Sequence, residues 1–109
     1  MANEVLLDVD RLRRFCTEVF VKVGLQRDDA FIVADSLVFA NLRGIDSHGI
    51  LRLPHYARRL ALGGSKANPN IAILKEKPAC ALIYGDNGMG QVIGHHAVKM
   101  AIQKAKTVG

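Results

Sequence analysis

The chain has 109 residues, of which 50% are hydrophobic, 23% charged and 6% aromatic, and its formal net charge at pH 7 is +5. This length favours one hydrophobic core over two, so we expect one compact unit. The basic charge suggests an anionic partner, but the lysines and arginines are scattered without a block of like charges, and few aromatic rings are present to stack on bases. The composition therefore argues against a nucleic-acid partner.

The most apolar stretch, FIVADSLVFA, is interrupted by Asp35 and Ser36 and is far shorter than the roughly 20 residues that cross a bilayer. The N-terminal residues MANEVLLDVD lack the basic start and apolar run of a secretory signal. Cys16 and Cys80 form no CxxC pair and are too few for a disulfide framework, so we interpret them as buried free thiols. These features predict a cytoplasmic protein with no membrane partner.

The first two predicted helices form an antiparallel hairpin joined by the short segment GLQRDD. The first is capped by Asp8 and ends at Gly24, and the second is capped by Asp28 or Asp29 and ends at Gly44. Helical spacing of apolar residues defines the buried face of each helix. The residues expected on these faces are Leu12, Phe15, Cys16, Val19 and Val23, followed by Ala30, Val33, Ala34, Leu37 and Val38.

A third helix is predicted to begin near Leu53 and to end at Gly63 and Gly64. Pro54 is acceptable in the first helical turn but costly further along, so a turn or short helical piece is expected over residues 47–52. The apolar positions at helical spacing are Ile50, Leu53, Ala57 and Leu60.

The pattern of apolar residues changes after residue 70. The segment IAILKEKPACALIYG contains two apolar runs separated by charges and Pro78, which predicts two strands. A final helix follows the turn residues DNGMG and carries Ile93, Ala97, Met100 and Lys104 on one face. The predicted fold class is therefore α/β, with a helical part over residues 1–64 and the start of an incomplete sheet domain over residues 70–109. A strand followed by a helix ordinarily leads to another strand, so we expect the chain to be an N-terminal fragment.

The glycines Gly85, Gly88, Gly90 and Gly94 follow a predicted strand and open a helix, as in a dinucleotide fingerprint. The pattern G-x-G-x-x-G fails, because the third glycine falls one residue late. A tight strand-to-helix turn is the better interpretation, with only a weak indication of a phosphate-binding loop.

The stretch RGIDSHGILRLPHYARRL gathers polar chemistry on one predicted helical face. His48, Arg52, Tyr56 and Arg59 are separated by four, four and three residues, so they would lie opposite the apolar positions. A guanidinium, an imidazole and a phenol could bind a small 2-hydroxy or 2-keto acid and move its hydroxyl proton. Spacing alone still favours a simpler role for these residues, namely Ser47 as a helix cap and the others as solvated side chains.

Metal and serine chemistry are not expected in this stretch. His48 and His55 are seven residues apart, about 10 Å along a helix, and the adjacent His95 and His96 point in different directions. Ser47 does not lie in a nucleophile elbow, and neighbouring residues rarely bring their side chains into nucleophile–base contact.

The run RGIDSHGILRLPHYARRLALGG, with the helices before it and GDNGMGQVIGHHAVKMAIQKAK after it, resembles the N-terminal part of the malate/L-lactate dehydrogenase family. These are NAD(P)-dependent 2-hydroxyacid oxidoreductases without a Rossmann fold. The resemblance implies that Ser47 and His48 line the active site and that His48 is a candidate acid/base for the substrate oxygen. It implies that Arg52 and Tyr56 lie on the substrate side. It assigns no cofactor-binding residue in this chain.

The family resemblance also carries expectations about the whole protein. The cofactor is NAD or NADP, the substrate is a small 2-hydroxy or 2-keto acid, and a homodimer is usual. Family members are roughly three times longer, and a second histidine beyond Gly109 competes with His48 for the acid/base role. We therefore expect this chain alone to be inactive. The alternatives are a non-enzymatic helical interaction module derived from the family and, less favoured, a small basic nucleic-acid binder.

Overall fold

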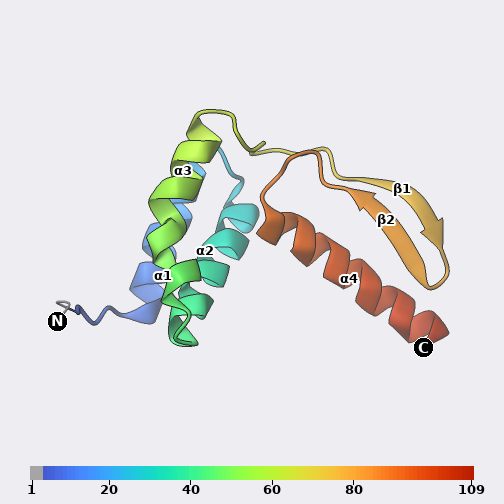
Figure 1. Ribbon diagram of the computed structural model, residues 1–109, viewed down its shortest axis with the longest axis horizontal. Coiled ribbons are helices and arrows are strands. Elements are labelled where there is room, and N and C mark those ends of the chain that lie inside the picture. Colours follow the sequence, from blue (N-terminus) through green and yellow to red (C-terminus); the bar gives the residue numbers. More distant parts are fainter. Residues whose placement is uncertain (1–3) are drawn as a thin grey trace.

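The computed structural model describes residues 4–109, which form a helical half and a half made of a β-hairpin and one long helix (Figure 1). This arrangement confirms the predicted α/β class. The elements in chain order are α1 (Val9–Lys22), α2 (Arg27–Leu42), the 3-10 turns η1 (Asp46–His48) and η2 (Ile50–Arg52), α3 (Leu53–Ala61), β1 (Ala72–Lys77), β2 (Cys80–Tyr84) and α4 (Gly90–Val108).

The helices α1 and α2 lie side by side as the predicted hairpin (Figure 1). Asp8 caps α1 by accepting a hydrogen bond from the Arg11 N–H at 2.8 Å, and Gly24 leaves the helix with φ +114°. The predicted cap of α2 is wrong, because the helix begins at Arg27 and Asp28 and Asp29 lie in its first turn. Carboxylates in a first turn still stabilise the helix through its dipole.

The hydrophobic core lies between α1 and α2 and is closed by α3 and the start of α4. All five residues predicted on the buried face of α2 are buried, as is Cys16 of α1. Phe15 is an exception, since it is 60% exposed while Phe20 is fully buried. The buried residues Cys16, Thr17 and Phe20 lie on one side of α1, and Phe15 lies about 100° around the helix from Cys16 in the other direction, so it faces away from them. The core cluster consists of Cys16, Phe20, Leu25, Ala30, Val33, Ala34, Leu37, Leu60, Met89 and Val92.

The third helix begins at Leu53 with Pro54 in its first turn, as predicted. The preceding residues form two separate 3-10 turns divided by Gly49, and Leu60 buries the end of α3 in the core. This broken entry changes the helical phase upstream of Leu53, because a 3-10 turn has three residues where an α-helix has 3.6.

The predicted strands form an antiparallel hairpin in which Ile73 pairs with Ile83 and Glu76 with Ala81. The predicted inner face of α4 is half-buried along its length. Lys104 on this face donates to the Lys77 carbonyl at 2.7 Å and lies 2.8 Å from a Glu76 carboxylate oxygen, which ties α4 to the hairpin. The other end of α4 reaches the helical core, so this helix joins the two halves.

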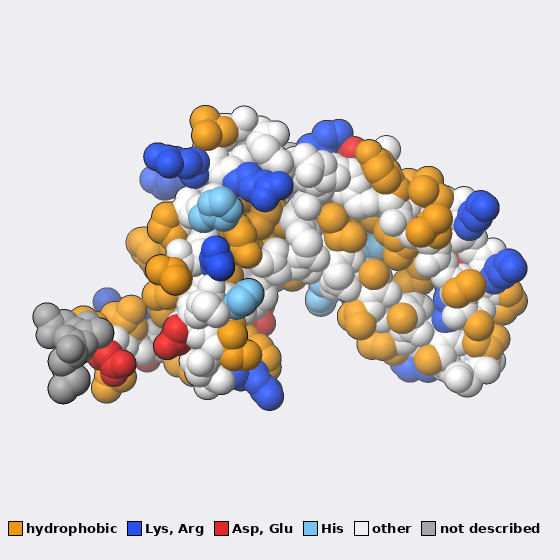
Figure 2. Space-filling view, in the orientation of Figure 1, with side chains coloured by type: hydrophobic (Ala, Val, Ile, Leu, Met, Phe, Trp, Pro, Cys, Tyr) orange, Lys and Arg blue, Asp and Glu red, His pale blue; other side chains and the backbone are white. Residues whose placement is uncertain are grey.

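The molecule is more extended than the expected compact unit. Its radius of gyration is 15.9 Å, against about 13 Å for a compact chain of this length. Figure 2 shows apolar side chains gathered over the hairpin and α4. Cys80 is exposed in this region, so the prediction that it is buried was wrong. Cys16 is buried as predicted, and this burial raises the pKa of its thiol. Within residues 4–109, no helix is both long and apolar enough to cross a membrane.

Candidate functional site

The turn η1 brings Ser47 and His48 into direct contact. The Ser47 hydroxyl lies 2.8 Å from Nδ1 of His48, and both residues are exposed. This contact corrects the expectation that the side chains of these adjacent residues would not meet. With Nδ1 occupied by the hydroxyl, Nε2 is the ring nitrogen left to face a reacting group.

Asn41, near the end of α2, holds this turn in place. Its amide Nδ2 donates to Asp46 Oδ1 at 2.9 Å, and its Oδ1 accepts from the Ile50 N–H at 2.8 Å. The amide thereby links the residues on either side of Ser47 and His48. Gly49 is required for this approach, since a Cβ at that position would lie 2.2 Å from Asn41 Oδ1.

Arg52 joins the same cluster. Its Nε donates to the Ser47 carbonyl oxygen at 2.9 Å, which places the guanidinium beside the Ser47–His48 turn. Within residues 4–109, Arg52 forms no ion pair with a carboxylate. Its terminal nitrogens therefore remain available for an external anion, which a guanidinium can bind with two parallel hydrogen bonds.

Tyr56 is placed differently from the predicted face. It is half-buried and packs against the core together with Ile50 and Leu53, which were expected opposite it. Within α3, Tyr56 lies three residues after Leu53 and four before Leu60, so it shares their face, and the expectation that it lay opposite them was wrong. Tyr56 also contacts a second pocket, one turn further along α3, that Arg59 shares. The structure thus brings Ser47, His48 and Arg52 together, whereas Tyr56 packs against the core and lines the pocket near Arg59.

The glycine-rich segment after β2 is a tight turn, as the better of the two interpretations held. Gly88 donates to the Gly85 carbonyl at 3.0 Å, while the positive φ angles fall on Asp86 and Asn87. Glycine is needed in this turn for close packing, since a Cβ at Gly85 would lie 2.5 Å from the Ile93 side chain.

The side chains of the turn also fasten it to the end of α3. Asp86 accepts from Lys66 Nζ at 2.8 Å and from the Asn70 N–H at 2.9 Å, and Asn87 donates to the Gly64 carbonyl at 3.1 Å. The bond from Lys66, reinforced by its charge and by the Asn70 N–H, lowers the pKa of Asp86, and the carboxylate in turn raises the pKa of Lys66.

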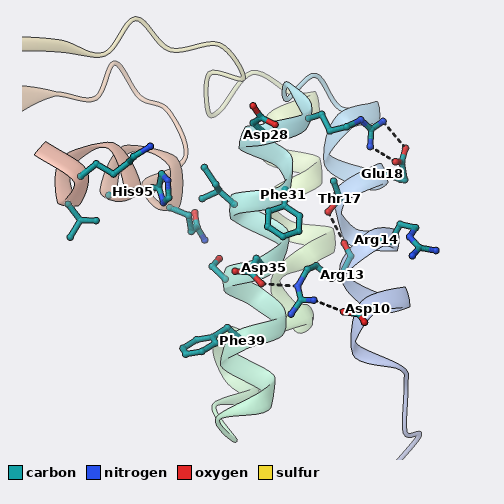
Figure 3. Close-up of a pocket in the computed structure, with 17 residues that line it drawn as sticks. Asp10, Arg13, Arg14, Thr17, Glu18, Asp28, Phe31, Asp35, Phe39 and His95 are labelled. Atoms are coloured by element: carbon teal, nitrogen blue, oxygen red, sulfur yellow. Dashed lines mark hydrogen bonds and ion pairs between the residues drawn. The ribbon is translucent and has the colours of Figure 1, made fainter. Parts of the chain in front are cut away.

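A groove of about 1440 Å³ lies between α1, α2 and α4, and none of the predicted site residues lines it (Figure 3). Its charged side chains are mostly paired with one another. Arg13 contacts both Asp10 and Asp35, and Arg27 contacts Glu18, which lowers the pKa of that carboxyl. The exposed rings of Phe31 and Phe39 line the rest. The groove therefore offers apolar surface more than reactive groups, and no group of three or more metal-ligating side chains occurs within residues 4–109.

Comparison with known proteins identifies the family. A sequence model described as malate/L-lactate dehydrogenase matches residues 7–109, nearly the whole chain. The chain belongs to the malate/L-lactate dehydrogenase family. The resemblance inferred from the SHG motif is thereby confirmed.

Individual relatives in this family agree with the match. The chain is 46% identical over 107 residues to malate dehydrogenase of Pyrococcus horikoshii, covering 98% of this chain and 30% of that protein. The solved structure of malate dehydrogenase from this organism matches all of the chain and 33% of its own, with a TM-score of 0.91 and 43% identity. L-sulfolactate dehydrogenase of Methanocaldococcus jannaschii is 45% identical over 105 residues, which are 96% of this chain and 30% of that protein. The NAD(+) ureidoglycolate dehydrogenase of Escherichia coli is 34% identical over 100 residues, with shares of 92% and 29%. The chain thus spans about a third of the length of these relatives.

Sequence reasoning did not find Asn41 as part of the site. Asparagine is a poor helix former in a helix interior, yet Asn41 stands at the end of α2, two residues before the Arg-Gly that opens the site motif. A polar amide at that position, next to Asp46 in a turn, was the available signal. Its partners could not be deduced, because they depend on how the 3-10 turns fold back on α2.

Proposed function

We propose that this chain supplies the proton-transfer and carboxylate-binding side of an NAD(P)-dependent 2-hydroxyacid dehydrogenase. The observation that carries the proposal is the Ser47–His48–Arg52 cluster, in which the hydroxyl is 2.8 Å from Nδ1 and the guanidinium is fixed beside it. Membership of the malate/L-lactate dehydrogenase family supports it.

In this proposal His48 moves the proton of the substrate oxygen. The contact with Ser47 orients the ring, and Nε2 either takes the proton of the 2-hydroxyl during oxidation or returns it to the keto oxygen during reduction. Ser47 can donate to an unprotonated Nδ1 or accept from a protonated one, so the same contact is kept in both directions. Ser47 is thus an orienting group, and His48 is the residue that touches the reacting oxygen.

Arg52 binds the substrate carboxylate in this scheme. The bond from its Nε to the Ser47 carbonyl fixes the guanidinium plane next to His48, and its terminal nitrogens face outward without a carboxylate partner within residues 4–109. A carboxylate held by both terminal nitrogens places the adjacent carbon and its oxygen near the imidazole. We also propose Tyr56 for the substrate side, as the family resemblance implies, although it is half-buried against the core.

The residues of the Ser47–His48–Arg52 cluster are suited to binding the acid substrate, and they do not account for binding of the whole cofactor. The cluster has a proton-transfer group and a carboxylate fork, which are the two groups that a 2-hydroxy acid requires. When bound, the nicotinamide supplies the hydride chemistry. NAD is named for the Escherichia coli relative, and both NAD and NADP stay candidates for this protein.

The names of the relatives support a small 2-hydroxy or 2-keto acid as the substrate class. We also infer a homodimer, as the family resemblance implies. The apolar side chains exposed on the hairpin and α4 support burial of this surface against further protein.

The test is a chimaeric enzyme in which this chain replaces the matching segment of the Pyrococcus horikoshii malate dehydrogenase. We expect NAD(P)-dependent oxidation of 2-hydroxy acids, and a 100-fold to 10,000-fold loss of turnover in His48→Asn, since general acid–base catalysis contributes about that factor. His55→Asn is the matched control, because His55 is exposed on α3 outside the cluster. Equal activities of these two variants would overturn the role of His48.

A further inference from the structure

The turn between β2 and α4, residues 85–88, lies beside the loop that follows α3 (Figure 1). We call it the Asn87 turn. The Asn87 amide Nδ2 donates to the Gly64 carbonyl at 3.1 Å, and the Asn87 carbonyl accepts from the Lys66 N–H at 2.8 Å. Asn87 therefore fastens the start of α4 to the end of α3.

The fold favours the pair Asn87–Gly88 at this point. Asn87 has φ +57°, a left-handed backbone conformation that asparagine adopts more readily than most residues. A Cβ at Gly88 would lie 2.6 Å from the Pro69 ring, so a larger residue would clash with the loop. Asn87 is the one asparagine of the sequence that is followed by glycine, whereas Asn70 is followed by Ile71. The packing of the turn thus places a chemically labile dipeptide here.

An asparagine followed by glycine can lose its amide without an enzyme, because glycine has no Cβ to shield its backbone nitrogen. In this reaction the Gly88 nitrogen bonds to Asn87 Cγ, the Cγ–Nδ2 bond breaks, and the proton of the Gly88 nitrogen leaves with Nδ2 as ammonia. Water then opens the cyclic imide, giving aspartate if it attacks the side-chain carbonyl and isoaspartate if it attacks the main-chain carbonyl. One water is consumed, one ammonia is released, and nothing is oxidised or reduced.

The closed turn restrains both reacting groups. The Gly88 N–H donates to the Gly85 carbonyl at 3.0 Å, and the Asn87 amide is held by the Gly64 carbonyl. The attack therefore requires the turn to open. Local opening costs less than unfolding where backbone hydrogen bonds are close to solvent, and Asn87 is exposed. The folded chain is thus expected to react slowly, from its opened turn.

The products do not fit the closed turn. An aspartate sets a carboxylate against the Gly64 carbonyl, where the amide now donates, and adds a negative charge next to Asp86. An isoaspartate lengthens the main chain by one carbon just before Met89 and Val92, which are 6% and 7% exposed in the core. Either product weakens the connection between the start of α4 and the end of α3.

We propose that Asn87 is a site of spontaneous deamidation in the folded protein, that opening of the Asn87 turn limits the reaction, and that the product loosens the start of α4. The reaction requires only water and is independent of the proposed dehydrogenase activity. Asn70 is the internal control. It is also exposed and its N–H contacts Asp86 of the same turn, but the β-branched Ile71 shields the nitrogen that would attack.

The protein is incubated in mildly alkaline buffer, with and without urea, and peptide mass spectrometry follows the conversion of each amide to an acid. In the folded protein, Asn87 should convert about tenfold or more faster than Asn70, because glycine leaves its nitrogen unshielded. Urea should speed the conversion of Asn87 by about tenfold or more, because the folded chain reacts only from its open fraction. Equal conversion of Asn87 and Asn70 in the folded protein would overturn the site, and equal rates at Asn87 with and without urea would refute control by the turn.

Two lysine variants test whether the contacts of the turn slow the reaction. Lys66→Gln removes the ion pair with Asp86, which measures 2.8 Å, and should speed conversion of Asn87 in the folded protein about twofold to fivefold, since an exposed pair contributes modestly. Lys99→Gln is the matched control, because Lys99 is exposed on α4 and forms no ion pair within residues 4–109. Both variants should react alike in urea. Equal rates in the two folded variants would also refute control by the turn.

Asn87→Asp reproduces one of the two products. Amide hydrogen exchange over residues 89–93 should be faster in this variant than in the parent, because the turn no longer holds the start of α4. Asn68→Asp adds the same charge at an exposed position of the neighbouring loop and should leave this exchange unchanged. If exchange in Asn87→Asp matched that in Asn68→Asp, the loosening of α4 would be wrong.

Discussion

The Asn41 amide donates to the Asp46 carboxylate at 2.9 Å, across the turn that carries Ser47 and His48. The other end of the same amide accepts from the Ile50 N–H. One side chain of α2 thus fixes both ends of the turn, and the position of the imidazole relative to the core depends on it.

Asn41→Asp should disrupt the site, because two carboxylates would face each other where an amide and a carboxylate now bond. We expect turnover of the chimaeric enzyme to fall about 10-fold to 100-fold through misplacement of His48. Adding Asp46→Asn exchanges the two groups and restores a donor and an acceptor, so the double variant should recover most of the loss. If the double variant were no better than Asn41→Asp, the amide–carboxylate bond would not be what positions the turn.

Alanine substitutions at two glycines should have opposite effects. Gly49→Ala forces a methyl group against Asn41 and should lower the free energy of unfolding, whereas a Cβ at Gly94 meets nothing within 4 Å inside α4. Gly94→Ala should therefore stabilise the protein by about 0.5–1 kcal/mol through helix propensity. Urea denaturation of both variants measures the change in the free energy of unfolding. A decrease in Gly94→Ala would contradict the packing described for α4.

Arg52→Lys should raise KM for the acid more than it lowers kcat. Lysine keeps the positive charge but loses the planar fork that binds a carboxylate with two parallel bonds, so we expect KM to rise by about 10-fold. Arg58→Lys is the control, because that arginine is exposed outside the cluster. Steady-state kinetics of the chimaeric enzyme over a range of acid concentrations decides the matter, and an unchanged KM in Arg52→Lys would remove this residue from the substrate side.

The Asp86–Lys66 ion pair predicts that the stability of the fold depends on pH. The pKa of Asp86 is lowered in the folded chain, so its stabilising contribution is fully present above the ordinary carboxyl pKa, near pH 4, and is lost as the pH falls towards the lower folded value. Asn tolerates the positive φ of this position, so Asp86→Asn removes the charge and keeps the turn. The variant should melt below the parent at pH 7, and the difference should shrink as the pH falls well below the ordinary carboxyl pKa in thermal denaturation. A difference independent of pH would show that the charge does not matter.

Two phenylalanines of α1 provide a direct test of the core. Phe20 is fully buried and Phe15 is 60% exposed, although both belong to the same helix. Phe20→Ala should cost about 3–5 kcal/mol of unfolding free energy, and Phe15→Ala less than about 1 kcal/mol. Equal losses in denaturant titration would indicate that Phe15 is covered in solution.

Most of the secondary structure could be predicted from the sequence because it depends on local signals. Helical periodicity, Asp8 as a cap and glycines after the helices placed α1, α2 and α4, and Pro54 fixed where α3 begins. The side of α1 that faces α2 was less certain, and Phe15 was wrongly assigned to it. An apolar residue can occupy an exposed position, so periodicity alone does not show which face is buried.

The candidate site was predictable in its residues but not in its geometry. The SHG motif identified Ser47, His48 and Arg52 through family resemblance. Ser47, His48 and Arg52 lie on two 3-10 turns instead of one helix, and Tyr56 shares the core-facing side of α3 with Leu53 and Leu60. Asn41 was missed because its two bonds, to Asp46 and to the Ile50 N–H, depend on how the 3-10 turns fold back on α2.

The helix α4 is held at both ends by different parts of the molecule. Its first turn is buried with α1 and α2, and Lys104 near its other end is bonded to the hairpin. A helix of 19 residues is about 28 Å long. It therefore acts as a rigid spacer that sets the distance between the helical core and the hairpin.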